Sequence, residues 1–185
     1  MNKQSFTFTV MATIGSLVAF AAPTFAAPAP ASHGTDAPRV TLEEMRTLAS
    51  TTANQAERVR MYGANYALSS DAQLSPLWTM KTDINTMGKE IATLQAERGT
   101  LQPWEQQAID KVLPLLKEAA SNTEEAIQFF NNNHNYLWSP EYRGYAQKVN
   151  QDAAQISKTL KTYLKYEKVQ NQEEQLHNTI TPGAN

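Results

Sequence analysis

The chain has 185 residues, no cysteine and a formal net charge of −2, with 18% of its residues charged. The absence of cysteine excludes disulfide bonds, thiolate metal sites and a thiol nucleophile, so the fold must be held together by packing. Charges of both signs are mixed and no basic block occurs, which argues against nucleic acid or an anionic membrane surface as a partner.

Residues 1–26 have the layout of a secretory signal peptide. Lys3 precedes a largely apolar run from Phe6 to Phe20, and small residues lead to a cleavage site after Ala26. The run is shorter and richer in Ser, Thr and Gly than a transmembrane helix, which needs about 20 mostly apolar residues. An uncleaved N-terminal anchor is the alternative. We expect an exported protein, periplasmic or secreted, with no stable membrane span after cleavage.

The next segment, residues 27–39, reads APAPASHGTDAPR. It is rich in Pro and Ala, lacks periodicity and predicts a flexible tail. Residues 40–180 are enough for one domain with a buried core. Residues 181–185 include Pro182 and Gly183 and are expected to be disordered.

A first helix is predicted from Thr41, where Thr41-Leu42-Glu43-Glu44 matches a capping box and Val40 can pack on Met45 as a hydrophobic staple. Residues spaced alternately by four and three then form a seam, the line of positions that faces other helices in a bundle. This seam consists mostly of small residues that allow close helix approach: Met45, Ala49, Thr52, Ala56, Val59, Gly63 and Tyr66.

A second helix is predicted from Ser75-Pro76 to near Gly99, with Ser75 as the N-cap and Pro76 at the first helical position. Its seam carries large side chains: Leu77, Met80, Ile84, Met87, Ile91 and Leu94. Large side chains that face small ones on neighbouring helices fill a bundle core without voids.

A third helix is predicted from Gln102-Pro103-Trp104, and Pro114 inside it predicts a kink. Its seam is Ile109, Val112, Leu116, Ala119, Thr123, Ala126 and Phe130.

A fourth helix is predicted from Ser139-Pro140-Glu141, which repeats the start signal of the second. Its seam is Tyr142, Ala146, Val149, Ala153, Ile156, Leu160 and Tyr163. Beyond Tyr163 the same register becomes polar at Glu167, Gln170, Glu174 and His177. We therefore expect the helix to run past the core as a solvated overhang that frays, with docking to a partner as the alternative.

Short connections and the lack of strand-like alternation predict an all-α protein, an up-down-up-down antiparallel four-helix bundle with coiled-coil-like seams. This topology brings most aromatic residues to one end of the bundle, here called the aromatic end. Its members are Tyr62, Tyr66, Trp78, Phe129, Phe130, Tyr136, Trp138, Tyr142 and Tyr145.

Two interpretations of the aromatic end stay open. In the first it is a hydrophobic plug, with the connection Asn131–Trp138 folded over the bundle and held down by Leu137 and Trp138. In the second it is a binding cleft for a protein, peptide, glycan or small amphipathic ligand. The candidate binding residues are then Tyr66, Trp78, His134, Tyr136, Trp138, Tyr142, Arg143 and Tyr145.

Catalytic motifs are missing from the sequence, which has no Gly-rich phosphate loop, nucleophile elbow or HExxH pattern. His134 has no acid–base partner nearby in sequence, so a hydrolase that uses it is the weakest hypothesis. The pair Glu174-x-x-His177 places a carboxylate and an imidazole on one helical face, as in di-metal bundles. Such sites need a second pair and two further inward glutamates, which the seams lack.

The stretch Leu42–Leu48, LEEMRTL, together with a histidine late in the last helix, resembles the periplasmic haem-b four-helix cytochromes. The resemblance covers only these short stretches and implies Met45 and His177 as iron ligands. If the first and last helices are level, however, Met45 lies near Lys165, and His177 is about 18 Å farther along. We therefore expect a non-enzymatic binding or interaction module without a cofactor, with a haem- or metal-binding bundle as the alternative.

Overall fold

A computed structural model describes residues 37–64 and 70–180. It contains four α-helices: α1 (Ala37–Gly63), α2 (Leu74–Ala96), α3 (Pro103–Asn132) and α4 (Pro140–Ile180). Three short 3₁₀ helices lie in the connections: η1 (Ser70–Gln73), η2 (Arg98–Thr100) and η3 (His134–Tyr136). No strand occurs within the described ranges. The predicted signal peptide, residues 27–36 of the predicted tail and residues 181–185 lie outside them.

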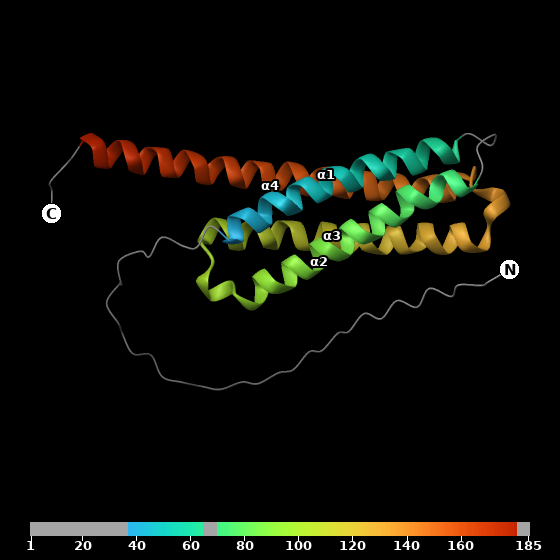
Figure 1. The fold of residues 1–185 in the computed structure, drawn as a ribbon, viewed down its shortest axis with the longest axis horizontal. Helices are drawn as coiled ribbons and strands as arrows, with labels where there is room; N and C mark the ends of the chain where they lie inside the picture. The colour runs from blue at the N-terminus through green and yellow to red at the C-terminus, as the bar shows by residue number, and fades with distance from the viewer. Residues whose placement is uncertain (1–36, 65–69, 181–185) are drawn as a thin grey trace, which may run out of the picture. The chain divides into compact units, whose positions relative to one another are not determined.

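The helices form an up-down-up-down four-helix bundle, as the sequence predicts. Each helix packs on two others in a ring, because α1 contacts α2 and α4, and α3 also contacts α2 and α4 (Figure 1). Consecutive helices are therefore neighbours. The end of α1, the start of α2, the end of α3 and the start of α4 lie together at one end of the bundle.

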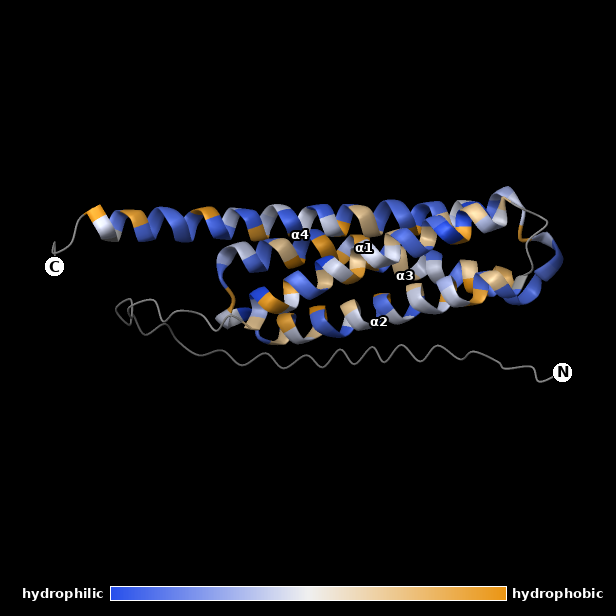
Figure 2. Ribbon diagram, turned by 45° about the horizontal axis from the view of Figure 1, so that its top comes forward, coloured by the Kyte–Doolittle hydropathy of each residue, from blue (hydrophilic) through white to orange (hydrophobic). Residues whose placement is uncertain are grey.

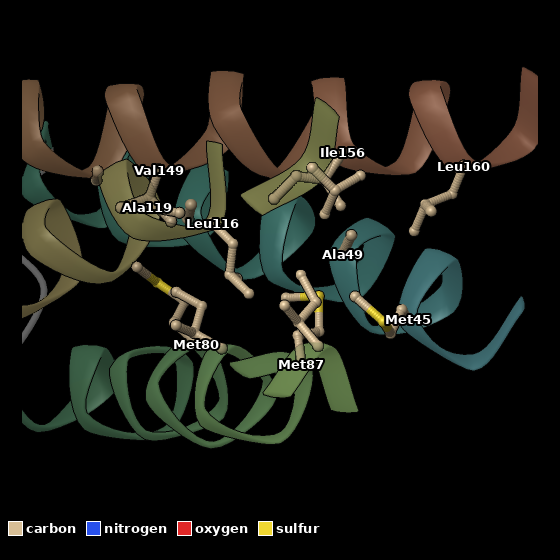
Figure 3. Close-up of a cluster of buried hydrophobic side chains, with 14 of the residues drawn as sticks. Met45, Ala49, Met80, Met87, Leu116, Ala119, Val149, Ile156 and Leu160 are labelled. Carbon is tan, nitrogen blue, oxygen red and sulfur yellow. The ribbon is translucent and has the colours of Figure 1, made fainter. Parts of the chain in front are cut away.

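The four predicted seams form the core. Among the described residues every seam position is buried except Tyr163, which is half-buried. Met80 and Met87 extend from α2 into the space between the helices, where Ala49 of α1 and Ala119 of α3 offer little volume (Figure 3). Deleting a buried group of this size leaves a cavity and destabilises a protein by about 2–5 kcal/mol. Alternation of large and small side chains across the helices thus fills this core.

Two of the predicted helix starts are confirmed. At the start of α4 the backbone N–H of Tyr142 donates to Ser139 Oγ over 3.2 Å, which makes Ser139 the N-cap. At the start of α3 the backbone N–H of Gln102 donates to the Glu105 carboxylate over 2.7 Å. In each case a side-chain oxygen accepts a hydrogen bond from a backbone N–H that has no intrahelical partner at a helix start.

The predicted capping box at Thr41 is wrong. Helix α1 already begins at Ala37, and the Thr41 hydroxyl donates to the Ala37 carbonyl over 3.0 Å, a bond typical of the helix interior. Val40 is therefore helical and 46% exposed, so it forms no staple. The additional first turn contains Arg39, which pairs with Glu167 of α4 at 3.4 Å.

Ser75 is likewise not an N-cap. Helix α2 begins at Leu74, directly after η1, with Gln73 as the preceding residue, and the Ser75 carbonyl already accepts a bond from the Thr79 hydroxyl. Because the 3₁₀ helix η1 runs directly into α2, no side-chain cap is needed at the start of α2.

Helix α4 has 41 residues and extends beyond the other three helices (Figure 1). The contact between Arg39 and Glu167 places the start of α1 level with Glu167. Residues 168–180, here called the overhang, continue the helix past this level, and every described side chain in them is exposed. The predicted extension past the core is confirmed. Within the described ranges, no helix combines the length and the apolar character that a membrane span requires.

Candidate functional site at the aromatic end

The aromatic end has a buried inner layer. Phe130, Leu137 and Tyr142 are at most 6% exposed, and the Tyr142 ring stacks on Phe129 with 5.6 Å between ring centroids and 28° between ring planes. These side chains come from the end of α3, the connection and the start of α4. Together they close the core at this end.

The connection lies directly on the end of α1, where Gly63 makes this contact possible. A Cβ atom on Gly63 would stand 2.8 Å from the Leu137 carbonyl oxygen and 3.1 Å from Cγ of Arg143. Carbon atoms are not found that close to a backbone oxygen, so only glycine allows the connection to approach this near. The sequence placed Gly63 in the first seam but gave no sign of this contact.

An outer layer of aromatic side chains lies over the closed core. Trp78 is 48% exposed, Tyr136 60% and Trp138 52%. The rings of Tyr136 and Trp138 are neighbours, with 6.2 Å between their centroids and a tilt of 45°. The Lys81 ammonium group stands 5.1 Å from the centre of the Trp78 ring, within the range of a cation–π interaction.

Amide side chains accompany this outer layer. Asn131, Asn132 and Asn135 are exposed, while the Asn133 side chain donates to the Phe129 carbonyl at the end of α3. His134 is exposed, and its ring meets Phe130 edge-on at 4.9 Å between centroids. The connection thus offers several side-chain amides to solvent.

Two further candidate residues are half-buried. The Tyr145 hydroxyl donates to the Glu141 carboxylate over 3.0 Å, and this hydrogen bond raises the pKa of Tyr145. Arg143 packs its stem against Gly63. Both belong to the first turns of α4.

The buried inner layer fits the plug interpretation, and the binding interpretation stays a prediction that concerns the exposed outer layer. Leu137 holds the connection down as the plug requires, but Trp138 is too exposed to do so. Tyr142 is fully buried and supports the site instead of lining it, while Trp78, Tyr136, Trp138 and His134 remain accessible. Tyr66 lies outside the described residues.

The Tyr142 hydroxyl is buried and has no hydrogen-bond partner among the described residues. Burial strongly raises the pKa of this group, so the phenol stays neutral at physiological pH. A buried hydroxyl without a partner loses the free energy of its bonds to water.

The residues that the haem resemblance implies do not meet. Met45 is buried in the core, about 9 Å inward from the level of Arg39 and Glu167, whereas His177 is exposed about 15 Å beyond that level. The two side chains are therefore too far apart to hold one iron. Glu174 shares the exposed overhang with His177, and the described part of the chain holds no cluster of three potential ligands from His, Asp and Glu.

Buried polar residues are what the sequence reading missed. Asp83 of α2 is 8% exposed, and its Oδ2 atom has no hydrogen-bond partner among the described residues. Asn150 of α4 donates to the Ala53 carbonyl of α1 over 2.8 Å and ties these helices together. Asp83 directly precedes seam residue Ile84, and Asn150 directly follows Val149. Such flanking positions are the signal that could have found them.

Comparisons with protein-family models, with curated proteins and with solved structures gave no match. The function must therefore be argued from the residues of this chain.

Proposed function

We propose that this protein is an exported, non-enzymatic binding module whose aromatic end takes a neutral glycan. The observation that carries the proposal is the pair of layers at this end. Trp78, Tyr136 and Trp138 are about half exposed, although the core beneath them is already closed.

The outer rings have no structural role in closing the core. Phe130, Leu137 and Tyr142 already cover the end of the bundle, and they are buried. Moving large aromatic side chains out of water lowers the free energy of the system. A group of exposed aromatic side chains is therefore typical of a binding surface. Their chemistry supports this view, because Trp and Tyr combine an apolar face with a polar tip.

The surroundings of Tyr136 and Trp138 favour a neutral ligand with many hydroxyl groups, whereas Trp78 has the Lys81 ammonium group beside it. Between Asn131 and Pro140 the sequence contains no Asp, Glu, Lys or Arg, while three of its asparagine side chains are exposed. A sugar ring presents an apolar C–H face that can stack on an aromatic ring, and hydroxyls that can bond to amides. A charged peptide would find fewer complementary groups on this connection.

The arrangement around His134 supports a binding role over a catalytic one. Its ring packs edge-on against Phe130, an apolar partner that neither orients a ring nitrogen nor accepts a proton. General acid–base catalysis by histidine normally relies on a polar partner that fixes the tautomer.

Neutral glycans and uncharged peptides can be tested in parallel with matched variants. Tyr136→Ala and Trp138→Ala should each weaken glycan binding at least about tenfold. Tyr166→Ala is the control, because Tyr166 is also an aromatic residue about half exposed, but it belongs to the far end of α4. If the chain binds the uncharged peptides and no glycan, the ligand of the aromatic end is a peptide. Equal binding by all three variants, or no binding by the parent chain, would refute a role of the aromatic end.

A further inference from the structure

An apolar stripe begins at Tyr166, just before the overhang, and continues along it. Its members are Tyr166, Val169, Leu176 and Ile180, which are 51%, 43%, 62% and 79% exposed. With Glu173 between them, these residues follow one another at spacings of three, four, three and four. This is the spacing of a coiled-coil seam, in which one face of a helix contacts a partner helix.

The stripe lies on a different line of α4 from the seam that faces the bundle. This line is apolar only beyond the end of the bundle. The same spacing traced back along α4 gives only polar residues: Thr162, Gln155 and Lys148 are exposed, and Thr159 and Asp152 are half-buried. Beyond Glu167 the relation reverses, since the bundle-facing register becomes polar and the outer face becomes apolar. Along the free part of α4, orange apolar bands lie among blue polar ones (Figure 2). A helix that only extended into solvent would have no reason to move its apolar residues to another face.

The charges of this region are separated along the helix. Lys161, Lys165 and Lys168 lie towards the bundle, and Glu173 and Glu174 lie towards the C-terminal end. Glu167 pairs with Arg39, whereas the other five residues form no ion pair within the described ranges. A second copy of the same helix is complementary to this pattern only when it runs in the opposite direction.

We propose that the overhang is a self-association surface that pairs antiparallel with the overhang of a second copy of this chain. With the two-fold axis near residue 171, Tyr166 lies level with Leu176 of the other copy, and Lys168 lies level with Glu174. A parallel pair would instead set the lysines beside lysines and the glutamates beside glutamates. In this register the Tyr166–Leu176 and Lys168–Glu174 contacts each occur twice across the two-fold axis, and Val169 lies level with Glu173 of the other copy.

The surface is short, so the pair should be weak and should depend on concentration. The overhang offers about 20 Å of helix at 1.5 Å per residue. Isolated helices of this length are marginal in water, so pairing would also stabilise the helix itself. This surface lies at the opposite end of α4 from the aromatic end, so self-association would leave the proposed glycan surface open.

Sedimentation equilibrium of residues 27–185, in a concentration series up to about 1 mM, tests the pairing. We expect a monomer–dimer equilibrium that the double variant Val169→Glu/Leu176→Glu weakens at least about tenfold. Met61→Glu/Leu74→Glu is the matched control, because Met61 and Leu74 are 58% and 40% exposed and lie away from the overhang. A parent chain that stays monomeric, or a control that weakens the dimer equally, overturns the proposal.

Single cysteines test the direction, since the natural chain has none. Gln172→Cys lies beside the two-fold axis and should form a disulfide between copies under mild oxidation. Ile180→Cys should not, because antiparallel pairing separates the two cysteines by about 27 Å along the axis and a disulfide needs Cα atoms within about 7 Å. Cross-linking of Ile180→Cys alone would show parallel pairing, and cross-linking of neither variant would show that the overhangs do not meet. Either result overturns the proposal.

Discussion

At the scale of single residues, two glycines offer a sharp comparison. Gly63→Ala should lower the free energy of unfolding by about 1–3 kcal/mol, because its Cβ would stand 2.8 Å from the Leu137 carbonyl oxygen. Gly88→Ala should raise it by about 0.5–1 kcal/mol, since Gly88 lies within α2 and its Cβ would meet nothing within 4 Å. Urea unfolding measures both. Equal effects would mean that the connection does not rest on α1.

Asp83 makes stability depend on pH. Burial raises the pKa of this carboxyl group in the folded state, and the nearby Thr52 hydroxyl offsets only part of the effect. An acid with a raised pKa favours folding below its unfolded pKa of about 3.9, and this contribution is lost as the pH rises through the folded pKa.

Asp83→Asn should therefore be more stable than the parent chain at about pH 7, and this advantage should disappear at about pH 3. Thermal unfolding across this pH range measures the difference. Asp71→Asn serves as the control, because Asp71 is exposed. If the Asp83→Asn variant is instead less stable than the parent chain at neutral pH, the carboxylate must have a stabilising partner.

At the scale of helices, the two Ser-Pro sequences can be separated by experiment. Ser139→Ala should lower the free energy of unfolding by about 1 kcal/mol, since Ser139 Oγ accepts the backbone N–H of Tyr142. Ser75→Ala should change it by less than about 0.5 kcal/mol, because Ser75 is exposed and already helical. Similar losses in the two variants would contradict this assignment of the helix starts.

The helices also show what a sequence can predict. The seams could be predicted because their spacing repeats over many turns and a single register satisfies all of it. Single helix starts depend on fewer residues. The identical signals at Ser75 and Ser139 lead to different structures because η1 runs directly into α2, whereas η3 ends at Tyr136, three residues before Ser139. The capping pattern at Thr41 failed because the helix already begins at Ala37, where the Thr41 hydroxyl donates to the carbonyl four residues earlier.

The layers of the aromatic end were beyond sequence reasoning for a physical reason. Helix topology brings the rings to one end, but the path of the connection decides which of them face solvent. That path depends on the contact between Gly63 and Leu137, a meeting of backbone and side-chain surfaces without a repeating pattern. Tyr142 and Trp138 are therefore both aromatic candidates in the sequence, yet one is buried and the other exposed.

At the scale of the whole molecule, the bundle and the overhang should be separable. A chain that ends after Glu167 should keep its unfolding free energy to within about 0.5 kcal/mol when measured as a dilute monomer, because every described side chain it loses is exposed. Glycan binding should also persist. A large loss of stability would mean that residues 168–185 contribute to the bundle.

We propose that the exposed rings of the aromatic end bind a neutral glycan, and the tryptophans allow a direct test. The three tryptophans provide internal probes, because Trp78 and Trp138 are about half exposed at this end, whereas Trp104 is buried at the start of α3. The most direct measurement is an NMR titration of the three indole N–H signals with neutral oligosaccharides. Saturable shifts of Trp78 and Trp138, with Trp104 unchanged, are the predicted result. Three signals that stay unchanged throughout the oligosaccharide series would contradict the account.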